Sequence, residues 1–306
     1  MPPVSHTWSP LADMRRLTIE HLTTYAYSQP VGFGEHRLMV RPLDSHDIRL
    51  VDSRIVIRPP ARVRWIHDVF GNSVAIVTFD GQSDELTIES RISVDHYGVE
   101  GIPIELEPRA ASLPMEYLED ERRDLEPLLA LHYDDPDGQV AAWVGRFLAG
   151  DGRTSTYHCL EAMTRAIKAE FGYSNRFEPG VQTPAETLVK GSGTCRDFAL
   201  LLMEAARSLG IAARFVSGYL YDPALDSDEP AMSGAGYTHA WAQIYLPGPG
   251  WTEFDPTNGI VGGSNLVRVS VARDPAQAIP IQGSYVGPRD AFERLDVEVR
   301  VTSSSP

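Results

Sequence analysis

The feature that most constrains the fold is a change of hydrophobic period along the chain. Over residues 17–97, apolar and polar residues alternate repeatedly, and turn signals such as Arg58-Pro59-Pro60 separate the alternating runs. Alternation with a period of two is typical of strands that bury one face. We therefore predict an all-β domain over residues 14–100, in the form of a sandwich. Packing, or presentation of a substrate, would be its simplest role.

Beyond a proline-bearing stretch at 101–114, which we interpret as a linker, the pattern becomes helical and then returns to strands. Apolar residues recur at helical spacing from Phe198 to Leu209, and Gly210 follows as a stop signal. These patterns predict a second domain over 115–290 and a final strand with a tail over 291–306. The overall class is α+β. Helices are expected near 140–148, 157–167 and 198–209, and strands over 213–221, 240–246, 251–254, 267–271 and 295–301.

The first 13 residues have neither a basic region nor an apolar stretch, so they do not resemble a secretory signal. We expect a disordered extension there, with Met14 as an alternative start. The chain has no run of 18 apolar residues, so we predict no membrane span. Its two cysteines, Cys159 and Cys195, match neither a metal-binding spacing nor a disulfide framework. A reducing cytoplasm fits this cysteine usage.

The formal net charge is −15, and no basic cluster stands out in the sequence. Binding to nucleic acid or to an anionic membrane is therefore not expected. An acidic protein would attract a cationic acceptor such as a lysine or a polyamine, although acidity also serves solubility alone. The sequence does not predict an oligomeric state.

Cys195 follows a run of small residues, Gly191 to Thr194, and begins the helical pattern. Unpaired backbone N–H groups and the helix dipole favour an anion at this position, and so favour a thiolate, which is a nucleophile. The N–H of Cys195 would point to a developing oxyanion. Small residues such as Gly193 would let a substrate backbone approach. Cys159 lies within a helical pattern and is expected to be inert packing.

Two residues downstream are candidate partners of the thiol. His239 begins a strand, and Asp255 lies in the returning strand after the turn at 247–250. Asp255 could fix the tautomer of His239 and raise its basicity, or it could simply cap a local turn. A turn centred between Gly248 and Pro249 would not place the two residues directly opposite each other. A bulge, a shifted turn or a diagonal contact is therefore required.

Together these segments resemble the bacterial transglutaminase-like superfamily. The blocks around Cys195, His239 and Asp255 follow the family's order and spacing. The likeness extends over nearly all of the chain from Met14 onward. The segments that carry it are 191–202, 214–219, Thr238-His239-Ala240-Trp241, 250–259 and 269–274 with Pro280 and Gly283, and in the β region 21–27, Arg41-Pro42 and 68–72.

The resemblance implies a papain-like thiol core with Cys195, His239 and Asp255 as a catalytic triad and no cofactor. Animal members of the family use a tryptophan to hold the oxyanion, and here Tyr173 is the candidate donor. They also need calcium, but the sequence contains no loop of alternating acidic ligands, so no metal is expected. Other candidates could line an acyl slot or serve only in packing. These substrate-binding candidates are Trp241, Trp251, Tyr219 and Gly193.

We therefore expect a cysteine enzyme that forms a thioester with the carbonyl of a peptide bond or a glutamine carboxamide. Water as acceptor would make it a peptidase or amidase, which we slightly favour, and an amine would make it a cross-linking transglutaminase. A non-catalytic peptide-binding module on the same fold is the third alternative. An arylamine-acyl enzyme shares the triad, but the N-terminal β domain does not fit it. The loop 222–236 could close over a substrate.

Overall fold

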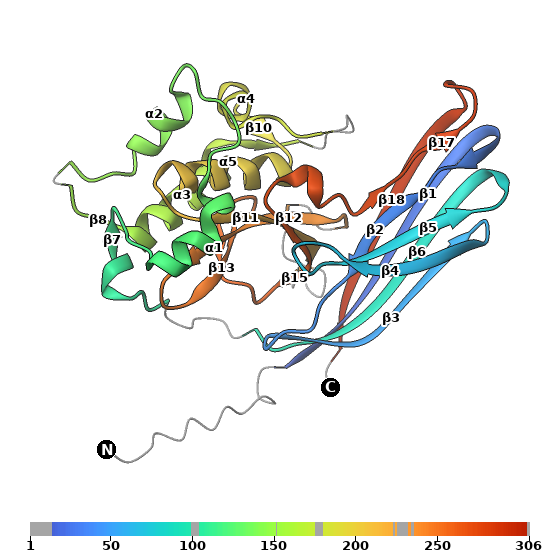
Figure 1. The fold of residues 1–306 in the computed structure, drawn as a ribbon, viewed down its shortest axis with the longest axis horizontal. Helices are drawn as coiled ribbons and strands as arrows, with labels where there is room; N and C mark the ends of the chain where they lie inside the picture. The colour runs from blue at the N-terminus through green and yellow to red at the C-terminus, as the bar shows by residue number, and fades with distance from the viewer. Residues whose placement is uncertain are drawn as a thin grey trace, which may run out of the picture.

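The computed structural model describes residues 14–98, 104–150, 152–174, 180–222, 224, 232–233 and 236–304. The expected extension at 1–13 and most of the 222–236 loop lie outside the described residues. Figure 1 shows two units side by side: long strands form one, and helices cover a sheet in the other. We call them the sandwich and the α+β core. No helix within the described ranges is long and apolar enough to cross a membrane.

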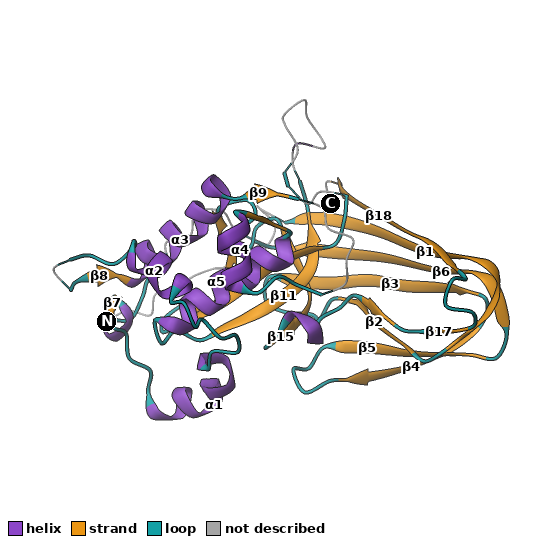
Figure 2. Cartoon of the chain, turned by 90° about the horizontal axis from the view of Figure 1, so that it is seen from above, coloured by secondary structure: helices purple, strands orange, loops and turns teal. Residues whose placement is uncertain are grey.

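The sandwich consists of two antiparallel sheets that lie face to face, as Figure 2 shows from above. In the first sheet, β1 pairs with β6, β17 and β18, and β6 pairs with β3; the second has the order β16-β2-β5-β4. Alternate residues such as Leu86 and Ile88 are buried between the sheets with Ala75 and Val77. The all-β prediction is thus confirmed. The strands are β1 (Arg15–Phe33), β2 (His36–Arg41), β3 (Ile48–Arg58), β4 (Ala61–His67), β5 (Ser73–Phe79), β6 (Gln82–His96), β16 (Ile281–Gln282), β17 (Tyr285–Val286) and β18 (Phe292–Ser304).

The last strand of the chain belongs to the sandwich. β18 runs antiparallel to β1, with pairs from Arg16↔Ser304 to Tyr27↔Phe292. The sequence pattern placed residues 291–306 after the second domain as a strand and tail. Their pairing instead brings the C-terminal end back to the first strand, so the sandwich is built from both ends of the chain.

The α+β core contains a five-stranded antiparallel sheet of order β14-β13-β12-β11-β15, on which α5 packs. The predicted apolar stripe from Phe198 to Ala205 is buried, and Gly210 takes the left-handed conformation (φ +73°) that ends the helix. The expected α+β class is confirmed. The helices are α1 (Glu119–Leu129), α2 (Gln139–Gly145), α3 (Thr156–Glu170), α4 (Pro184–Lys190) and α5 (Cys195–Ser208). The strands are β7 (Ser112–Leu113), β8 (Thr154–Ser155), β9 (Gly172–Tyr173), β10 (Ser192–Gly193), β11 (Ala213–Leu220), β12 (His239–Leu246), β13 (Gly250–Asp255), β14 (Ile260–Val261) and β15 (Leu266–Ala272).

The two units share a buried interface. Apolar residues of β1 and β6 pack against β11 and β15, with Ile19 and Tyr219 among those that are fully enclosed. The turn after β4 adds two hydrogen bonds to this interface. The Asn72 side chain donates to Val271 O at 2.7 Å and accepts from Val271 N at 2.9 Å. One amide side chain thus satisfies both backbone groups of a β15 residue. Such paired contacts fix the orientation of the sandwich against the core.

Candidate active site

Cys195 is the first residue of α5, and the helix start is fixed by the residues around it. Thr194 is the N-cap, and its hydroxyl accepts from the Asp197 N–H at 3.4 Å. The Asp197 carboxylate in turn accepts from the Thr194 N–H and hydroxyl, both at 2.9 Å. This capping box leaves the thiol at the end of the helix, where the first N–H groups have no partner within the helix. Cys195 itself is 7% exposed.

Asp197 also connects this turn to the preceding loop. It is fully buried, and its oxygens accept from the Gln182 N–H at 2.7 Å and the Gln182 side-chain amide at 3.2 Å. A Cβ on Gly193 would lie 2.9 Å from the Cβ of Asp197 and 3.1 Å from the ring of Phe198. Gly193 is therefore required by the packing of the thiol helix. The approach of a substrate backbone at Gly193, expected from the sequence, stays a prediction.

His239 and Asp255 are brought together by a diagonal contact across β12 and β13. The pair Leu246↔Gly250 centres the turn on Gly248, half a residue from the expected centre. In this register Asp255 lies two residues before the position directly opposite His239. The side chains of Asp255 and His239 are therefore on the same face of the sheet. His239 Nε2 lies 2.9 Å from Asp255 Oδ2, and both side chains are buried. The diagonal contact that the sequence analysis required is thus present.

The electrostatics of this pair favour a protonated imidazole. Burial alone would lower the pKa of His239, but the Asp255 carboxylate and its hydrogen bond, together with the adjacent Cys195 sulfur, outweigh burial and raise that pKa well above its usual range. His239 Nδ1 has no hydrogen bond of good geometry with any described residue, yet the Cys195 sulfur is close enough to act on the ring. The imidazole therefore lies between a carboxylate and a thiol.

Asp255 is held by the turn that follows it. Its Oδ1 accepts from the N–H groups of Thr257 at 3.0 Å and Asn258 at 3.3 Å, and its Oδ2 accepts from the Asn258 side-chain amide at 2.8 Å. Burial acts to raise the pKa of Asp255, but His239 and these donors lower it. The two interpretations of Asp255, a turn cap and a partner of His239, therefore hold at once, because one oxygen serves mainly the turn and the other the imidazole.

Tyr173 lies beside the thiol. β9 pairs in parallel with β10 and places Tyr173 in register with Gly193, two residues before Cys195. Burial, followed by the charge of Cys195 and a hydrogen bond with it, raises the pKa of Tyr173 above its ordinary value. The phenol therefore remains protonated at neutral pH and keeps an O–H to donate. The ring is held by an edge contact with Phe198, with centroids 6.5 Å apart.

Family models match parts of both units of the chain. The model for the bacterial transglutaminase-like N-terminal region matches residues 17–95, and that for the transglutaminase-like superfamily matches residues 146–256. An uncharacterized protein of Mycobacterium tuberculosis (strain H37Rv) is 31% identical over 95% of this chain and 94% of its own length. The chain belongs to the transglutaminase-like superfamily.

Two further comparisons agree with this membership. An uncharacterized protein of Mycobacterium leprae is 30% identical over 94% of this chain and 99% of its own length. Among solved structures, a protein of Cytophaga hutchinsonii described as a candidate cysteine protease matches with a TM-score of 0.67 at 19% identity. That match covers 95% of this chain and 91% of the other. At this identity the likeness concerns the fold, and it includes the combination of both units.

Trp241 packs against the His239 imidazole of this transglutaminase-like protein. It is fully buried, and its ring is stacked on His239 with centroids 5.9 Å apart. Its Nε1 donates to Glu253, which also accepts from the Gln243 side-chain amide at 2.7 Å. Trp241 thus supports His239 from the side. Of the two roles expected for Trp241, lining an acyl slot or packing, these contacts show packing.

The other two aromatic candidates lie away from the triad residues. Tyr219 is buried in the interface with the sandwich, where its hydroxyl lies 2.9 Å from His21 Nδ1. The guanidinium carbon of Arg214 lies over the ring of Trp251, 4.1 Å from the ring centroid, and Trp251 also contacts Tyr245. We therefore do not assign either residue to the site. Alternation along a strand indicates burial but does not reveal which neighbour an aromatic ring will meet.

Sequence reasoning did not identify the polar residues that orient the site. Gln182, Glu253 and Asn258 each hold a residue next to the thiol or the imidazole. Only Asn258 gave a local signal, since it follows Asp255 in a turn sequence. Within the described residues, no group of three or more His, Cys, Asp or Glu could hold a metal ion.

Proposed function

We propose that this transglutaminase-like protein is a cysteine enzyme that cleaves or transfers the acyl group of an amide, and that Cys195, His239 and Asp255 are its catalytic residues. The observation that carries the proposal is the arrangement of His239 between the Asp255 carboxylate, at 2.9 Å, and the Cys195 thiol at the start of α5. A protonated imidazole next to a thiol at a helix N-terminus stabilises the thiolate that nucleophilic chemistry needs.

The proposed reaction has two steps. The Cys195 thiolate attacks the amide carbonyl, and the C–N bond breaks as His239 donates its proton to the leaving amine, which gives a thioester. His239, now neutral, then takes a proton from water or from a second amine as that nucleophile attacks the thioester. The thiolate leaves and the acid or the new amide is released. Asp255 keeps Nδ1 of His239 directed to the sulfur throughout.

We propose two donors for the oxyanion of each tetrahedral intermediate. One is the backbone N–H of Cys195 at the helix start, and the other is the phenol of Tyr173, which interacts with the same sulfur. A carbonyl attacked by Cys195 would develop its negative charge close to the sulfur and therefore close to both donors. Removing one such donor typically slows turnover by about 10²–10³-fold.

Hydrolysis is the favoured outcome. An amine acceptor competes with water best in a dry aromatic slot. Of the aromatic candidates for such a slot, Trp241 is committed to His239 and Glu253, and Trp251 to Arg214. Their engagement elsewhere supports water as the acceptor, with a peptide or protein as substrate. A cross-linking transglutaminase is the second candidate function, and it rests on the same three residues.

The chain contains its own control for the test of the thiol. Cys159 lies buried in α3, where burial raises the pKa of its thiol to about 11. We expect iodoacetamide at pH 6 to alkylate Cys195 and to leave Cys159 unmodified, as read by mass spectrometry of the digest. Cys195→Ala should abolish turnover and leave the fold intact. Cys159→Ala should retain turnover. An active Cys195→Ala protein would show that Cys195 is not the nucleophile. A Cys195 that resists alkylation would favour the non-catalytic peptide-binding module.

The acceptor can be identified by incubating the protein with a casein digest and a primary amine. New peptide termini in the mass spectra would indicate proteolysis, and mass gained at glutamine would indicate transfer to the amine. Cys195→Ala serves as the blank for both products. Both cysteines are free thiols, and we propose a reducing compartment such as the cytoplasm for this enzyme.

A further inference from the structure

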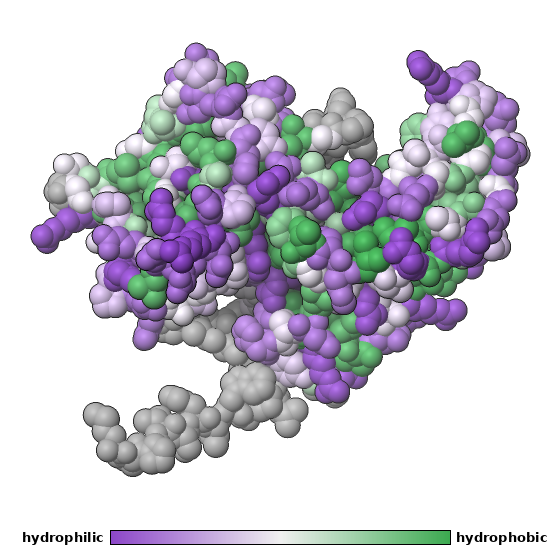
Figure 3. Space-filling model, in the orientation of Figure 1, coloured by the Kyte–Doolittle hydropathy of each residue, from purple (hydrophilic) through white to green (hydrophobic). Residues whose placement is uncertain are grey.

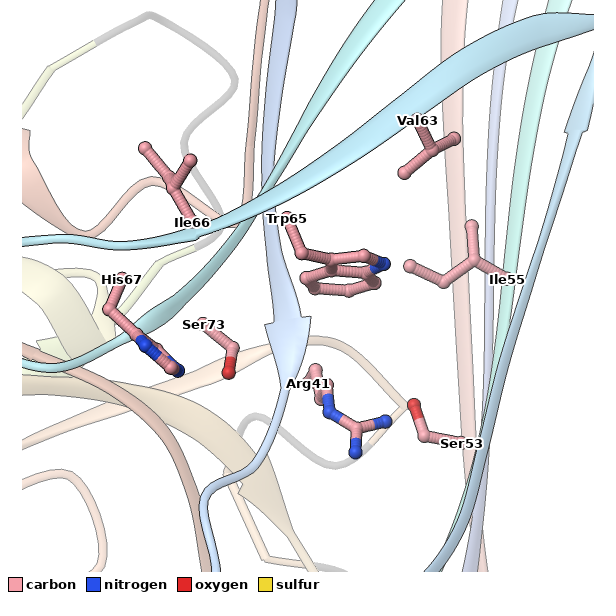
Figure 4. Close-up of a pocket in the computed structure, with 8 residues that line it drawn as sticks. All are labelled: Arg41, Ser53, Ile55, Val63, Trp65, Ile66, His67 and Ser73. Carbon is pink, nitrogen blue, oxygen red and sulfur yellow. The ribbon is translucent and has the colours of Figure 1, made fainter.

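The open edge of the sandwich carries a groove that the proposed catalytic chemistry does not use. β3 is the last strand of one sheet and β4 the last strand of the other, and the two are consecutive in the chain. Between them lies a groove of about 510 Å³. Figure 4 shows Trp65, Val63 and Ile55 pointing toward one another, with the Arg41 guanidinium near Ser53. The groove is lined by Arg41, Ser53, Ile55, Val63, Trp65, Ile66, His67 and Ser73.

The apolar wall of this groove is unusually exposed. Trp65 is 44% and Val63 43% exposed. Their partners in β5, Ala75 and Val77, are buried in the centre of the sandwich, so Trp65 and Val63 point into the same interlayer space at its edge. Figure 3 shows apolar surface bordered by polar residues over the region where β4 and β5 lie in Figure 1. An exposed apolar patch rimmed by polar residues is typical of a binding surface.

The charge of this edge is opposite to that of the chain. Residues 48–67 contain five arginines and a single carboxylate, whereas the whole chain has a net charge of −15. All five arginines are exposed, and only Arg62 forms an ion pair, with Asp80, among the described residues. No basic cluster was expected from the sequence. The arginines are visible in the sequence as one contiguous stretch, and the structure adds that β3 and β4 are the edges of the two sheets.

From these observations we propose that the β3–β4 edge binds an extended acidic segment of another polypeptide, which adds as a strand alongside β4. An edge strand has backbone N–H and C=O groups free to pair with such a segment. Side chains of β4 alternate, with Val63 and Trp65 facing the groove and Arg62 and Arg64 facing the outer side. A strand paired with β4 would place its own side chains in the same alternation. The edge therefore selects apolar residues alternating with Asp or Glu.

The arginines also argue against a second copy of the chain as the occupant. Two β4 edges brought together would place Arg62 and Arg64 against identical residues, and like charges directly opposite destabilise a strand pair. An acidic strand instead gains favourable charge pairing there. The proposal is independent of the catalytic chemistry, because the groove belongs to the sandwich and binding can be measured without a reactive thiol.

The test uses Cys195→Ala protein, which binds but does not turn over, and fluorescein-labelled peptides measured by anisotropy. The probe is an eight-residue peptide of alternating Glu and Val. Its controls are a peptide of the same composition with the four Glu before the four Val, and an alternating Lys and Val peptide. We expect the alternating acidic peptide to bind at least about tenfold more tightly than either control, and binding to weaken as salt increases.

Two variants locate the site. Trp65→Ala and Arg64→Glu should each weaken binding by about tenfold or more, because one removes the apolar wall and the other reverses a charge at the outer side. Arg122→Glu is the matched control, an exposed arginine of α1 on the other unit with no ion pair to a described residue, and should change binding less than about twofold. Circular dichroism of each variant checks that the sandwich is folded.

Each remaining outcome contradicts the proposal. Equal binding of the alternating and blocked peptides would mean attraction by charge alone, without strand addition. Binding unaffected by both Trp65→Ala and Arg64→Glu would place the site elsewhere, and absence of binding would remove it. If an oligothymidylate binds more tightly than the acidic peptide and Arg64→Glu abolishes that binding, this result would assign the edge to nucleic acid. Dimerisation in sedimentation that Arg64→Glu changes would assign it to a second copy.

Discussion

Asp47 of the sandwich is ion-paired with Arg268 of the core sheet, and the two guanidinium nitrogens lie 2.9 and 2.7 Å from its carboxylate oxygens. Arg268 also donates to Glu253 Oε1 at 2.7 Å, and Glu253 accepts from Trp241, whose ring is stacked on His239. A continuous set of contacts thus runs from the sandwich to the imidazole. The sandwich therefore contributes to the position of a proposed catalytic residue that lies in the other unit.

Arg268→Met should destabilise the protein and disturb the site. It leaves the carboxylate of Glu253, which is 6% exposed, without its cation, and removal of one partner from a buried pair costs about 3–5 kcal/mol. We expect the urea midpoint to fall and kcat to fall with it. The double variant Arg268→Met/Glu253→Gln removes the more buried of the two carboxylates that lose their cation and should recover part of the stability, while Asp47, which is 23% exposed, stays unpaired. A single variant as stable as the parent would mean that Glu253 does not depend on Arg268.

Asp255→Asn should lower activity and shift its pH dependence. The negative charge of Asp255 raises the pKa of His239, so its removal lets the imidazole lose its proton at a lower pH. The alkaline limb of the kcat/KM profile should therefore move to lower pH, and kcat should fall by roughly 10²–10⁴-fold. The alkylation rate of Cys195 as a function of pH provides a second measure. An alkaline limb that stays in place would show that another group governs it.

Tyr173→Phe separates oxyanion stabilisation from activation of the thiol. The variant keeps the ring against Phe198 and loses only the hydroxyl. We expect kcat to fall by about 10²–10³-fold with little change in KM. Alkylation by iodoacetamide forms no oxyanion, so its rate at Cys195 should not fall. If both rates fell together, Tyr173 would act on the sulfur, and an unchanged kcat would exclude it from the reaction.

The parts of the fold that could be predicted from the sequence are those set by local pattern. The buried stripe of α5 and the cysteine at its start depend on residues within a few turns, and both lie where the pattern placed them. From the sequence we could say that the site requires a contact between His239 and Asp255, but not whether the hairpin provides it. A hairpin register depends on the turn, and centring on Gly248 differed from the expected centre by half a residue.

Contacts between distant segments gave no local signal. β18 pairs with β1 nearly 300 residues away, with Arg16 opposite Ser304, and its alternating pattern would fit any sheet edge. Arg268 and Asp47 are 221 positions apart, and each alone resembles an ordinary surface charge. From the sequence, Tyr219 could line an acyl slot or serve only in packing. Its place in the interface is determined by His21, which the sequence did not connect to it.

His21 should make the stability of the protein depend on pH. It is buried in the interface, with Nδ1 2.9 Å from the Tyr219 hydroxyl and Nε2 3.0 Å from that of Thr23. Burial lowers its pKa from 6.5 to about 4, so the folded state holds the neutral ring. Between these two values the unfolded chain binds the additional proton. Stability is therefore complete above pH 6.5 and falls as the pH decreases toward 4, by about 1.4 kcal/mol per pH unit.

The contribution of His21 can be isolated with His21→Gln, which retains hydrogen-bonding groups but does not titrate. Urea unfolding at pH 7 and pH 5 gives the loss of unfolding free energy between the two pH values. This loss should be smaller for the variant than for the parent, because the variant lacks the one proton that His21 binds on unfolding. Burial also lowers the pKa values of His36 and His96, so part of the pH dependence should remain in the variant. An identical loss in both proteins would mean that His21 is not held neutral, and that the interface accepts a charge next to Tyr219.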